Sequence, residues 1–257
     1  MNSLYLAIDS VADLLRRKIK RDSWLWNCLK GIKDIFYSLR HNPINEIRWK
    51  SNYNRFEGMI EQYSLETHDF FVLEIGAFDG VLSDPIYKWI KKYQWHGILV
   101  EPQREGFERL KTIHGDNDNL KLENVAVAET NGQRPLYKVK DEYIVADWQR
   151  RIASFLPKPH LEKQDMVTTE MIPCVTFDTL LDRHHVKKVD LLQIDVEGYD
   201  YELLKSFNFE RIKPQLIRYE HRHLRLSDKS SCIKLLTQKG YKILEMEYDT
   251  GAALRND

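Results

Sequence analysis

One short stretch of this 257-residue sequence combines glycines with carboxylates at a spacing that suits ligand binding. Glu74 stands two residues before a Gly-x-x-x-Gly segment at positions 76–80. Glycine lets the backbone turn tightly and approach a ligand closely. A dinucleotide-binding loop would read Gly-x-Gly-x-x-Gly, but Ala77 and Phe78 break that pattern. Glu74 and Asp79 instead favour a cationic ligand, such as the ammonium group of an amino acid.

Two further positions extend this site toward a nucleoside. Glu101 ends the next apolar run, 25 residues after the first glycine, and a carboxylate there can accept both hydroxyls of a ribose. Asn124, with the adjacent backbone of Val125 and Ala126, is placed to address an adenine edge. Each residue alone could be a turn glycine, a surface acid or a cap. Their order along the chain favours a single ligand site.

Acidic and imidazole side chains also end two later apolar runs, at Asp195 and at Glu220-His221. Adjacent parallel strands lie about 5 Å apart, so Asp195 and Glu220 can face one point above a sheet. In one interpretation, Asp195, Glu220 and His221 hold Mg²⁺ or Mn²⁺, which lowers the pKa of a bound hydroxyl group. In a second, no metal binds and His221 or Asp195 is the catalytic base. In a third, Glu220 and His221 only pair with Arg218 or Arg222.

Alternating apolar runs and amphipathic segments must position these residues. The strands are predicted at 70–75, 97–100, 120–128, 134–139, 171–175, 189–194, 216–219 and 241–247, and the helices at 81–93, 103–114, 176–185, 199–207 and 227–239. Such alternation predicts an α/β fold with a doubly wound, mostly parallel sheet. Its ligand is expected at the carboxyl ends of the strands, where the acids and glycines fall.

The polar stretch 140–170 interrupts this alternation and predicts a long loop or lid. Its aromatic, basic and hydroxyl side chains are Tyr143, Trp148, Arg150, Arg151, Ser154, Phe155, Lys158 and His160. Aromatic and basic side chains together suit stacking on a sugar face or holding an anionic acceptor. The segment is predicted to form the acceptor wall, and an ordinary solvated loop is the alternative.

Residues 1–43 differ from the domain predicted at 44–257. Apolar residues recur at helical spacing, two tryptophans stand at Trp24 and Trp26, and eight basic against four acidic residues give a local charge of +4. This helical extension is expected to pack on the main domain or on a second copy, which would make a homo-oligomer. The alternative is peripheral contact with an anionic membrane surface.

Composition narrows the class of partner. Lysines and arginines number 39, as do aspartates and glutamates, so net charge is zero and nucleic acid is not an expected partner. Three scattered cysteines, Cys28, Cys174 and Cys232, indicate reduced thiols rather than a zinc site. No apolar run has the length of a membrane span and no secretory signal is visible. A cytoplasmic protein is expected, peripheral to the inner membrane face if residues 1–43 bind there.

With these motifs in order, the chain resembles the FkbM family of methyltransferases over residues 70–222. The resemblance rests on five segments: 74–80 (EIGAFDG), 100–102 (VEP), 124–126 (NVA), 175–180 (VTFDTL) and 190–198 (DLLQIDVEG). The family usually has Asn where this chain has Phe78, and Lys where it has Gln193.

The resemblance implies a class I methyltransferase fold, Rossmann-like and doubly wound with seven strands, that uses S-adenosylmethionine. It also implies methyl transfer to a hydroxyl of a sugar, glycolipid or related small acceptor. The residues expected to bind the cofactor are Glu74, Gly76, Ala77, Asp79, Gly80, Ser83, Glu101, Pro102, Asn124, Val125, Ala126 and Asp195. Those expected to act on the acceptor are Asp195, Glu220 and His221. A nucleic-acid methyltransferase and a non-catalytic binding or scaffold protein are the alternatives.

Overall fold

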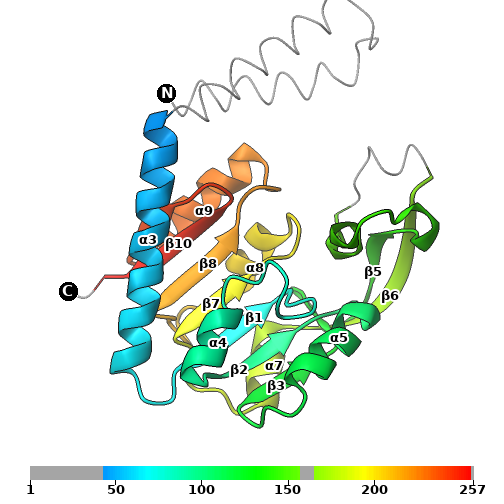
Figure 1. Ribbon diagram of the computed structural model, residues 1–257, viewed down its shortest axis with the longest axis horizontal. Helices are drawn as coiled ribbons and strands as arrows, with labels where there is room; N and C mark the ends of the chain where they lie inside the picture. The colour runs from blue at the N-terminus through cyan, green and yellow to red at the C-terminus, as the bar shows by residue number, and fades with distance from the viewer. Residues whose placement is uncertain (1–42, 157–164, 256–257) are drawn as a thin grey trace, which may run out of the picture.

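A twisted seven-stranded sheet forms the centre of the computed structural model, which describes residues 43–156 and 165–255 (Figure 1). Its strands are β1 (Phe71–Ile75), β2 (His96–Val100), β3 (Leu120–Glu123), β7 (Leu191–Ile194), β8 (Leu216–Glu220), β9 (Tyr241–Glu245) and β10 (Asp249–Leu254). They lie in the order β3-β2-β1-β7-β8-β10-β9, with β10 antiparallel to both of its neighbours. The predicted doubly wound, mostly parallel sheet of seven strands is confirmed.

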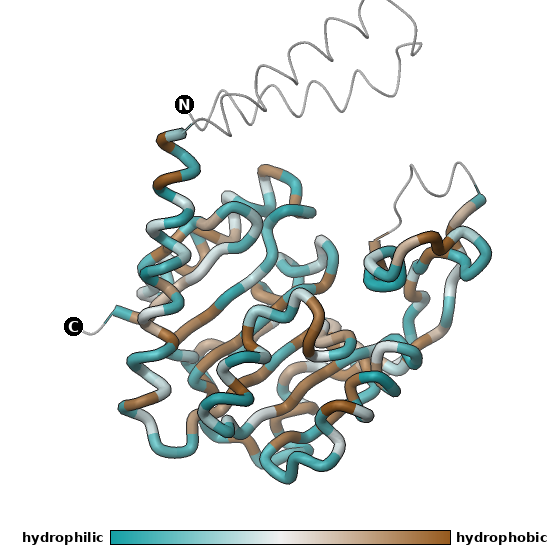
Figure 2. Tube along the Cα trace, in the orientation of Figure 1, coloured by the Kyte–Doolittle hydropathy of each residue, from teal (hydrophilic) through white to brown (hydrophobic). Residues whose placement is uncertain are grey.

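Helices cover both faces of this sheet. They are α3 (Pro43–Glu66), α4 (Tyr87–Tyr93), α5 (Arg104–His114), α7 (Phe177–Arg183), α8 (Asp200–Ser206) and α9 (Leu226–Gln238). Side chains alternate across β1, so Leu73 and Ile75 join a core with α7, α8 and α9, whereas Val72 joins a core with α3, α4 and α5. Because both faces are buried, the central strands are nearly continuous apolar runs (Figure 2).

A second, three-stranded sheet stands at one end of the molecule (Figure 1). Its strands are β4 (Ala126–Val127), β5 (Gly132–Val139) and β6 (Val167–Val175), in the order β4-β6-β5. Two short 3₁₀-helices, η1 (Asp141–Tyr143) and η2 (Asp147–Arg151), follow β5. The segment predicted as one long loop at 140–170 is therefore partly regular, and part of it, residues 157–164 with Lys158 and His160, lies outside the described residues.

Several predicted boundaries were wrong for local reasons. The strand predicted at 120–128 is split into β3 and β4, which belong to different sheets. The helix predicted at 81–93 begins only at Tyr87, because carboxylates capture the preceding backbone. The Asp79 carboxylate accepts from the N–H groups of Val81 and Leu82, and that of Asp84 accepts from Ile86 N–H.

Two elements were not predicted. One is helix α3, which occupies Pro43–Glu66 of the described residues. The other is strand β10, in which the α-carbon of Gly251 packs against α3. A Cβ atom there would stand 2.5 Å from the ring of Phe56, so the close approach of α3 requires glycine.

The N-terminal extension predicted to be basic and helical, residues 1–43, lies outside the described residues except for Pro43. Among the helices that the structure describes, none combines the length and apolar character needed to cross a bilayer. Cys174 and Cys232 are buried free thiols, as the sequence predicted for them.

Candidate active site

One large cavity, of about 600 Å³, opens at the carboxyl ends of β1, β2, β7 and β8. This is the edge at which parallel α/β sheets place their ligands. The cavity is lined by Glu74, Gly76, Ala77, Ser83, Glu101, Pro102, Ala126 and Asp195, all of which the sequence placed in the cofactor site. Its opposite wall comes from the acidic ends of β7 and β8 and from the segment after β5.

Gly76 makes the tight turn that ends β1. Its φ of 92° lies in the left-handed region, and a Cβ atom there would stand 1.9 Å from the backbone oxygen of Asp195. The backbone N–H groups of Gly76 and Ala77 both donate to the carbonyl of Val100, at 2.9 and 3.1 Å. This turn brings the end of β1 against β2 and leaves the floor of the cavity free of side chains.

Glu101 is held in a fixed orientation at the end of β2. One carboxylate oxygen accepts from Phe78 N–H at 2.8 Å and the other from Gln103 N–H at 2.6 Å. Only 3% of Glu101 is exposed. Burial raises the pKa of Glu101 to about 7, against the lowering effect of the two backbone donors. A carboxylate in this position can accept hydroxyl groups from a ligand in the cavity.

A pair of carboxyl groups, Glu74 and Asp84, lies beside Glu101 in the cavity wall. Burial and the neighbouring Asp84 carboxyl raise the pKa of Glu74 well above its usual value, and burial raises the pKa of Asp84 to about 6. The two carboxyls form a hydrogen bond in which Glu74 keeps the proton and Asp84 accepts it. A pair of buried carboxyls that shares a proton suits a cationic donor, such as an ammonium group, that can take the place of that proton.

Asp79 and Gly80 do not line the cavity, contrary to prediction. The Asp79 carboxylate is engaged, because it accepts two backbone N–H groups and pairs with Arg151 at 3.1 Å. The Arg151 guanidinium lies 4.9 Å above the ring of Phe78 and also donates to the carbonyl of Leu82. Arg151 thereby ties η2 to the loop after β1, and Asp79 has a structural role in that tie.

Asn124 and Val125 are also absent from the cavity wall. The Asn124 amide donates to the carbonyls of Glu101 and Pro102, at 2.8 and 3.2 Å. It therefore fixes the loop after β2 instead of facing a ligand. Ala126 and the next residue, Val127, line the cavity in its place.

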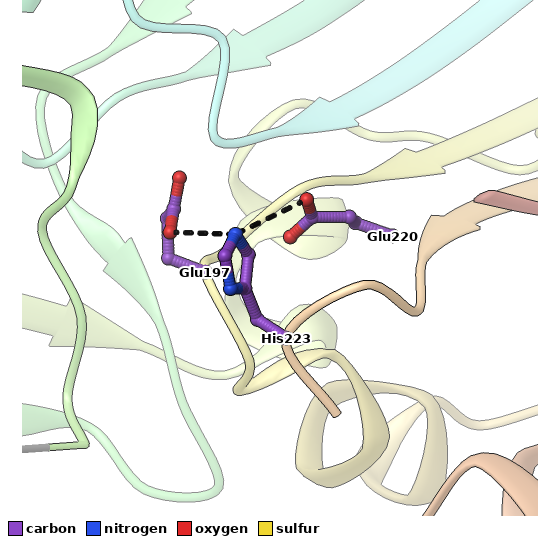
Figure 3. A group of neighbouring side chains, drawn as sticks. All are labelled: Glu197, Glu220 and His223. Carbon is purple, nitrogen blue, oxygen red and sulfur yellow. Dashed lines mark ion pairs between the residues drawn. The ribbon is translucent and has the colours of Figure 1, made fainter. Parts of the chain in front are cut away.

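The acidic wall of the cavity combines Asp195, Glu197, Glu220 and His223. Nε2 of His223 lies 3.5 Å from Glu197 Oε2 and 3.6 Å from Glu220 Oε1 (Figure 3). Desolvation, followed by repulsion from Asp195, raises the pKa of Glu220 to about 10. Asp195 is open to the cavity, and desolvation by the cavity walls with repulsion from Glu197 raises its pKa to about 8.

His221 points away from this wall, so the structure does not bring together the predicted set of Asp195, Glu220 and His221. His221 is 2% exposed, and its Nδ1 lies 2.8 Å from the hydroxyl of Thr250 on β10. Beyond β8 the chain turns, with Leu224 N–H donating to the carbonyl of His221. This turn carries His223 back over the cavity. The sequence contains both histidines, but no periodic pattern beyond the strand end predicts which of them faces the acidic wall.

The segment after β5 supplies the remaining wall of the cavity, and its role as the acceptor wall stays a prediction. Trp148, Arg151, Ser154 and Phe155 line the cavity, whereas Tyr143 and Arg150 do not. Arg150 instead pairs with Glu105 on α5. Trp148 is 61% exposed, which leaves an aromatic face open at the cavity mouth.

Comparisons with known proteins concern the chain as a whole. A sequence profile described as "Methyltransferase FkbM domain" matches residues 74–243. A comparison with curated protein sequences finds no match. Among solved structures, the methyltransferase FkbM from Methylobacillus flagellatus KT has a TM-score of 0.46 and 12% identity over 74% of this chain and 47% of that chain. This chain thus spans about half the length of that protein.

Other solved structures of similar fold are methyltransferases as well. The precorrin-6y C5,15-methyltransferase from Geobacter metallireducens GS-15 has a TM-score of 0.41 and 11% identity, over 78% of this chain and 87% of that chain. The Pyrococcus abyssi tRNA (uracil-54, C5)-methyltransferase, in complex with S-adenosyl-L-homocysteine, has a TM-score of 0.35 and 14% identity, over 77% of this chain and 37% of that chain.

Proposed function

Because this chain belongs to the FkbM methyltransferase family, with the class I fold that uses S-adenosylmethionine, we propose that it methylates a hydroxyl group of a carbohydrate, glycolipid or related small acceptor. The observation that carries the proposal is the two-sided cavity. Glu101 and the Glu74–Asp84 pair form one side, and the acidic wall at the ends of β7 and β8 forms the other.

The residues of the first side fit S-adenosylmethionine. Bound there, the cofactor supplies an electrophilic methyl group on a sulfonium. Glu101, held by two backbone donors, is oriented to accept the ribose hydroxyls. The Glu74–Asp84 pair, which shares a proton inside the cavity wall, is placed to receive the amino-acid ammonium. Ala126 and Val127 offer an apolar surface for the adenine.

The second side supports a hydroxyl acceptor. An unactivated alcohol must lose its proton as it attacks, so a base or a cation has to stand beside the methyl group. Asp195 faces the cavity with a pKa of about 8, which lets it take a proton near neutral pH. Glu197, Glu220 and His223 line the same wall, and their ligand atoms lie within 4.8 Å of one another, which supports a divalent cation there (Figure 3). The wall therefore allows either a direct base or a cation that activates the hydroxyl group.

Carbohydrate is favoured as the acceptor class by the cavity mouth. The open face of Trp148 can stack on the apolar face of a sugar ring, and Arg222 adds a cationic donor for its hydroxyls. Nucleic acid is disfavoured as an acceptor, because the chain has a net charge of zero. A non-catalytic scaffold is disfavoured too, because no scaffold role requires Glu74, Glu101 and Asp195 to line one cavity.

Two measurements test the proposal. Calorimetry with S-adenosylhomocysteine should give saturable binding to the wild-type protein and much weaker binding to Glu101→Ala. Absence of binding at millimolar ligand, or wild-type affinity in the variant, would refute the assignment of this cavity as the cofactor site. Transfer of a labelled methyl group from S-adenosylmethionine should then be measured on glycans, RNA and protein in parallel. Labelling of RNA or protein alone would refute the carbohydrate assignment.

A further inference from the structure

We infer that Glu197, Glu220 and His223 form a binding site for one divalent first-row cation, with Mn²⁺ preferred over Mg²⁺. The three residues come from different elements: Glu197 follows β7, Glu220 ends β8, and His223 lies on the turn beyond it. Each offers one ligand atom, and the three atoms lie within 4.8 Å of one another (Figure 3). This set replaces the one expected from sequence, since His221 faces Thr250.

The spacing of the ligand atoms supports a shared ion. Nε2 of His223 lies 3.5 and 3.6 Å from the two carboxylate oxygens, farther than the ~2.8 Å of a charge-assisted hydrogen bond. Ligands that each stand ~2.1 Å from one cation are separated by roughly 3.0 to 4.2 Å, depending on coordination angle. Both measured separations fall within that interval. One nitrogen set at similar distances from two carboxylates is the arrangement around a common centre.

A second histidine–glutamate contact in the same molecule shows the contrast. Nε2 of His184 lies 2.6 Å from Glu123 Oε1, and Arg183 occupies the other oxygen of Glu123 at 2.6 Å. That contact is a closed ion pair, with a guanidinium already present and no room between the ligand atoms. The separation around His223 is wider than in that closed pair.

Buried acceptors in the same cavity supply a second reason for a cation. Oε2 of Glu220 is buried and receives no hydrogen bond from the described residues. Gln193, which lines the same cavity and is only 3% exposed, has its Oε1 in the same condition. Buried oxygens without a donor are costly unless a donor or a cation reaches them. One of these oxygens lies in the acidic wall and the other lines the same cavity, which favours a positively charged occupant there.

The donor set selects the kind of ion. Two carboxylates with one imidazole and no thiolate disfavour a structural zinc site, and an imidazole ligand disfavours Mg²⁺ and Ca²⁺, which prefer oxygen. Mn²⁺ accepts both donor types. With three protein ligands, such an ion retains positions for an acceptor hydroxyl, whose pKa it lowers. That catalytic use rests on the proposed function, whereas binding of the ion does not.

Mn²⁺ binding to the full-length protein tests the site directly. After treatment with chelator and its removal, the protein is titrated with Mn²⁺, and free Mn²⁺ is followed by electron paramagnetic resonance. We expect one saturable site, competed less effectively by Mg²⁺. Glu197→Gln and His223→Gln should each weaken binding by more than about tenfold. His184→Gln is the matched control, because it removes a histidine from the closed pair with Glu123, and should bind as the wild type.

Each outcome either supports or refutes the cation site. Absence of saturable binding at millimolar Mn²⁺, or wild-type affinity in both folded variants, overturns the site. Thermal melts of each variant identify any that fail to fold, and the two substitutions on separate elements provide independent tests. Calorimetry with S-adenosylhomocysteine on the same samples separates the proposals. Cofactor binding without Mn²⁺ binding refutes only the cation site, while Mn²⁺ binding without methyl transfer to any hydroxyl acceptor refutes only the proposed function.

Discussion

Replacing Glu101 by glutamine should change both the pH dependence of stability and the affinity for the cofactor product. Burial raises the folded-state pKa of Glu101 from 4.5 to about 7. Between these values the unfolded chain has already lost the proton that the folded chain keeps. Folding stability therefore falls as pH rises through this window, by about 1.4 kcal/mol for each pH unit. Glutamine has no proton to lose, so Glu101→Gln should lack this component.

The magnitude follows from the two pKa values. From pH 5 to pH 8, this one group lowers the wild-type free energy of unfolding by about 2.5 kcal/mol relative to the variant. The glutamine amide also places an N–H₂ group against Phe78 N–H or Gln103 N–H, which costs about 1–3 kcal/mol at every pH. Because that cost does not depend on pH, the difference between the two pH profiles isolates the carboxyl group.

Urea unfolding of both proteins at pH 5 and pH 8 measures the effect. Glu108→Gln on the exposed face of α5 is the control and should follow the wild-type profile. Calorimetry at pH 8 should show that Glu101→Gln binds S-adenosylhomocysteine about tenfold to a hundredfold more weakly, as expected for a hydrogen bond to a charged group. If the profiles of Glu101→Gln and the wild type run parallel, the argument from burial is wrong.

Three further changes test other parts of the cavity. Gly76→Ala should lower the free energy of unfolding by at least about 3 kcal/mol in urea titrations, because its Cβ would meet the Asp195 backbone, and an unchanged midpoint would contradict the turn geometry. Arg151→Ala should speed S-adenosylhomocysteine dissociation about fivefold in stopped-flow measurements by releasing Asp79, and an unaltered rate would assign that ion pair no part in holding the ligand. Trp148→Ala should raise the acceptor KM about tenfold and leave the affinity for the cofactor unchanged. A lower cofactor affinity in this variant would show that Trp148 contacts the cofactor and not the acceptor.

The cofactor side of the cavity could be predicted from sequence because it is built from consecutive residues at strand ends. Alternation of strands and helices fixes which edge of the sheet carries the ligand, so Glu74, Gly76 and Glu101 converge once the topology is correct. Asp79 and Asn124 were placed wrongly on this side. Their partners, Arg151 and the Pro102 carbonyl, are brought to them by loops whose paths no periodicity encodes.

The acceptor side could not be predicted to the same depth. The turn after β8 decides that His223 and not His221 faces Glu220. Backbone hydrogen bonds to Tyr248 and His221 form this turn, and they have no periodic pattern in the sequence. Strand β10, which holds His221 through Thr250, was itself missed, since Gly251 gives it little strand propensity. The error in the predicted ligand set follows from that missed strand.

Both sides of the cavity nevertheless follow one electrostatic rule. Glu74 and Asp84 at one end, and Glu220 at the other, are carboxyl groups that folding desolvates and places beside other acids. A fold selected for stability alone would not gather them, because each desolvated acid costs free energy. Positive charge at each end would offset that cost, from an ammonium group near Glu74 and a cation near Glu220. Both occupants should therefore stabilise the folded protein together, because the two sites share no carboxylate.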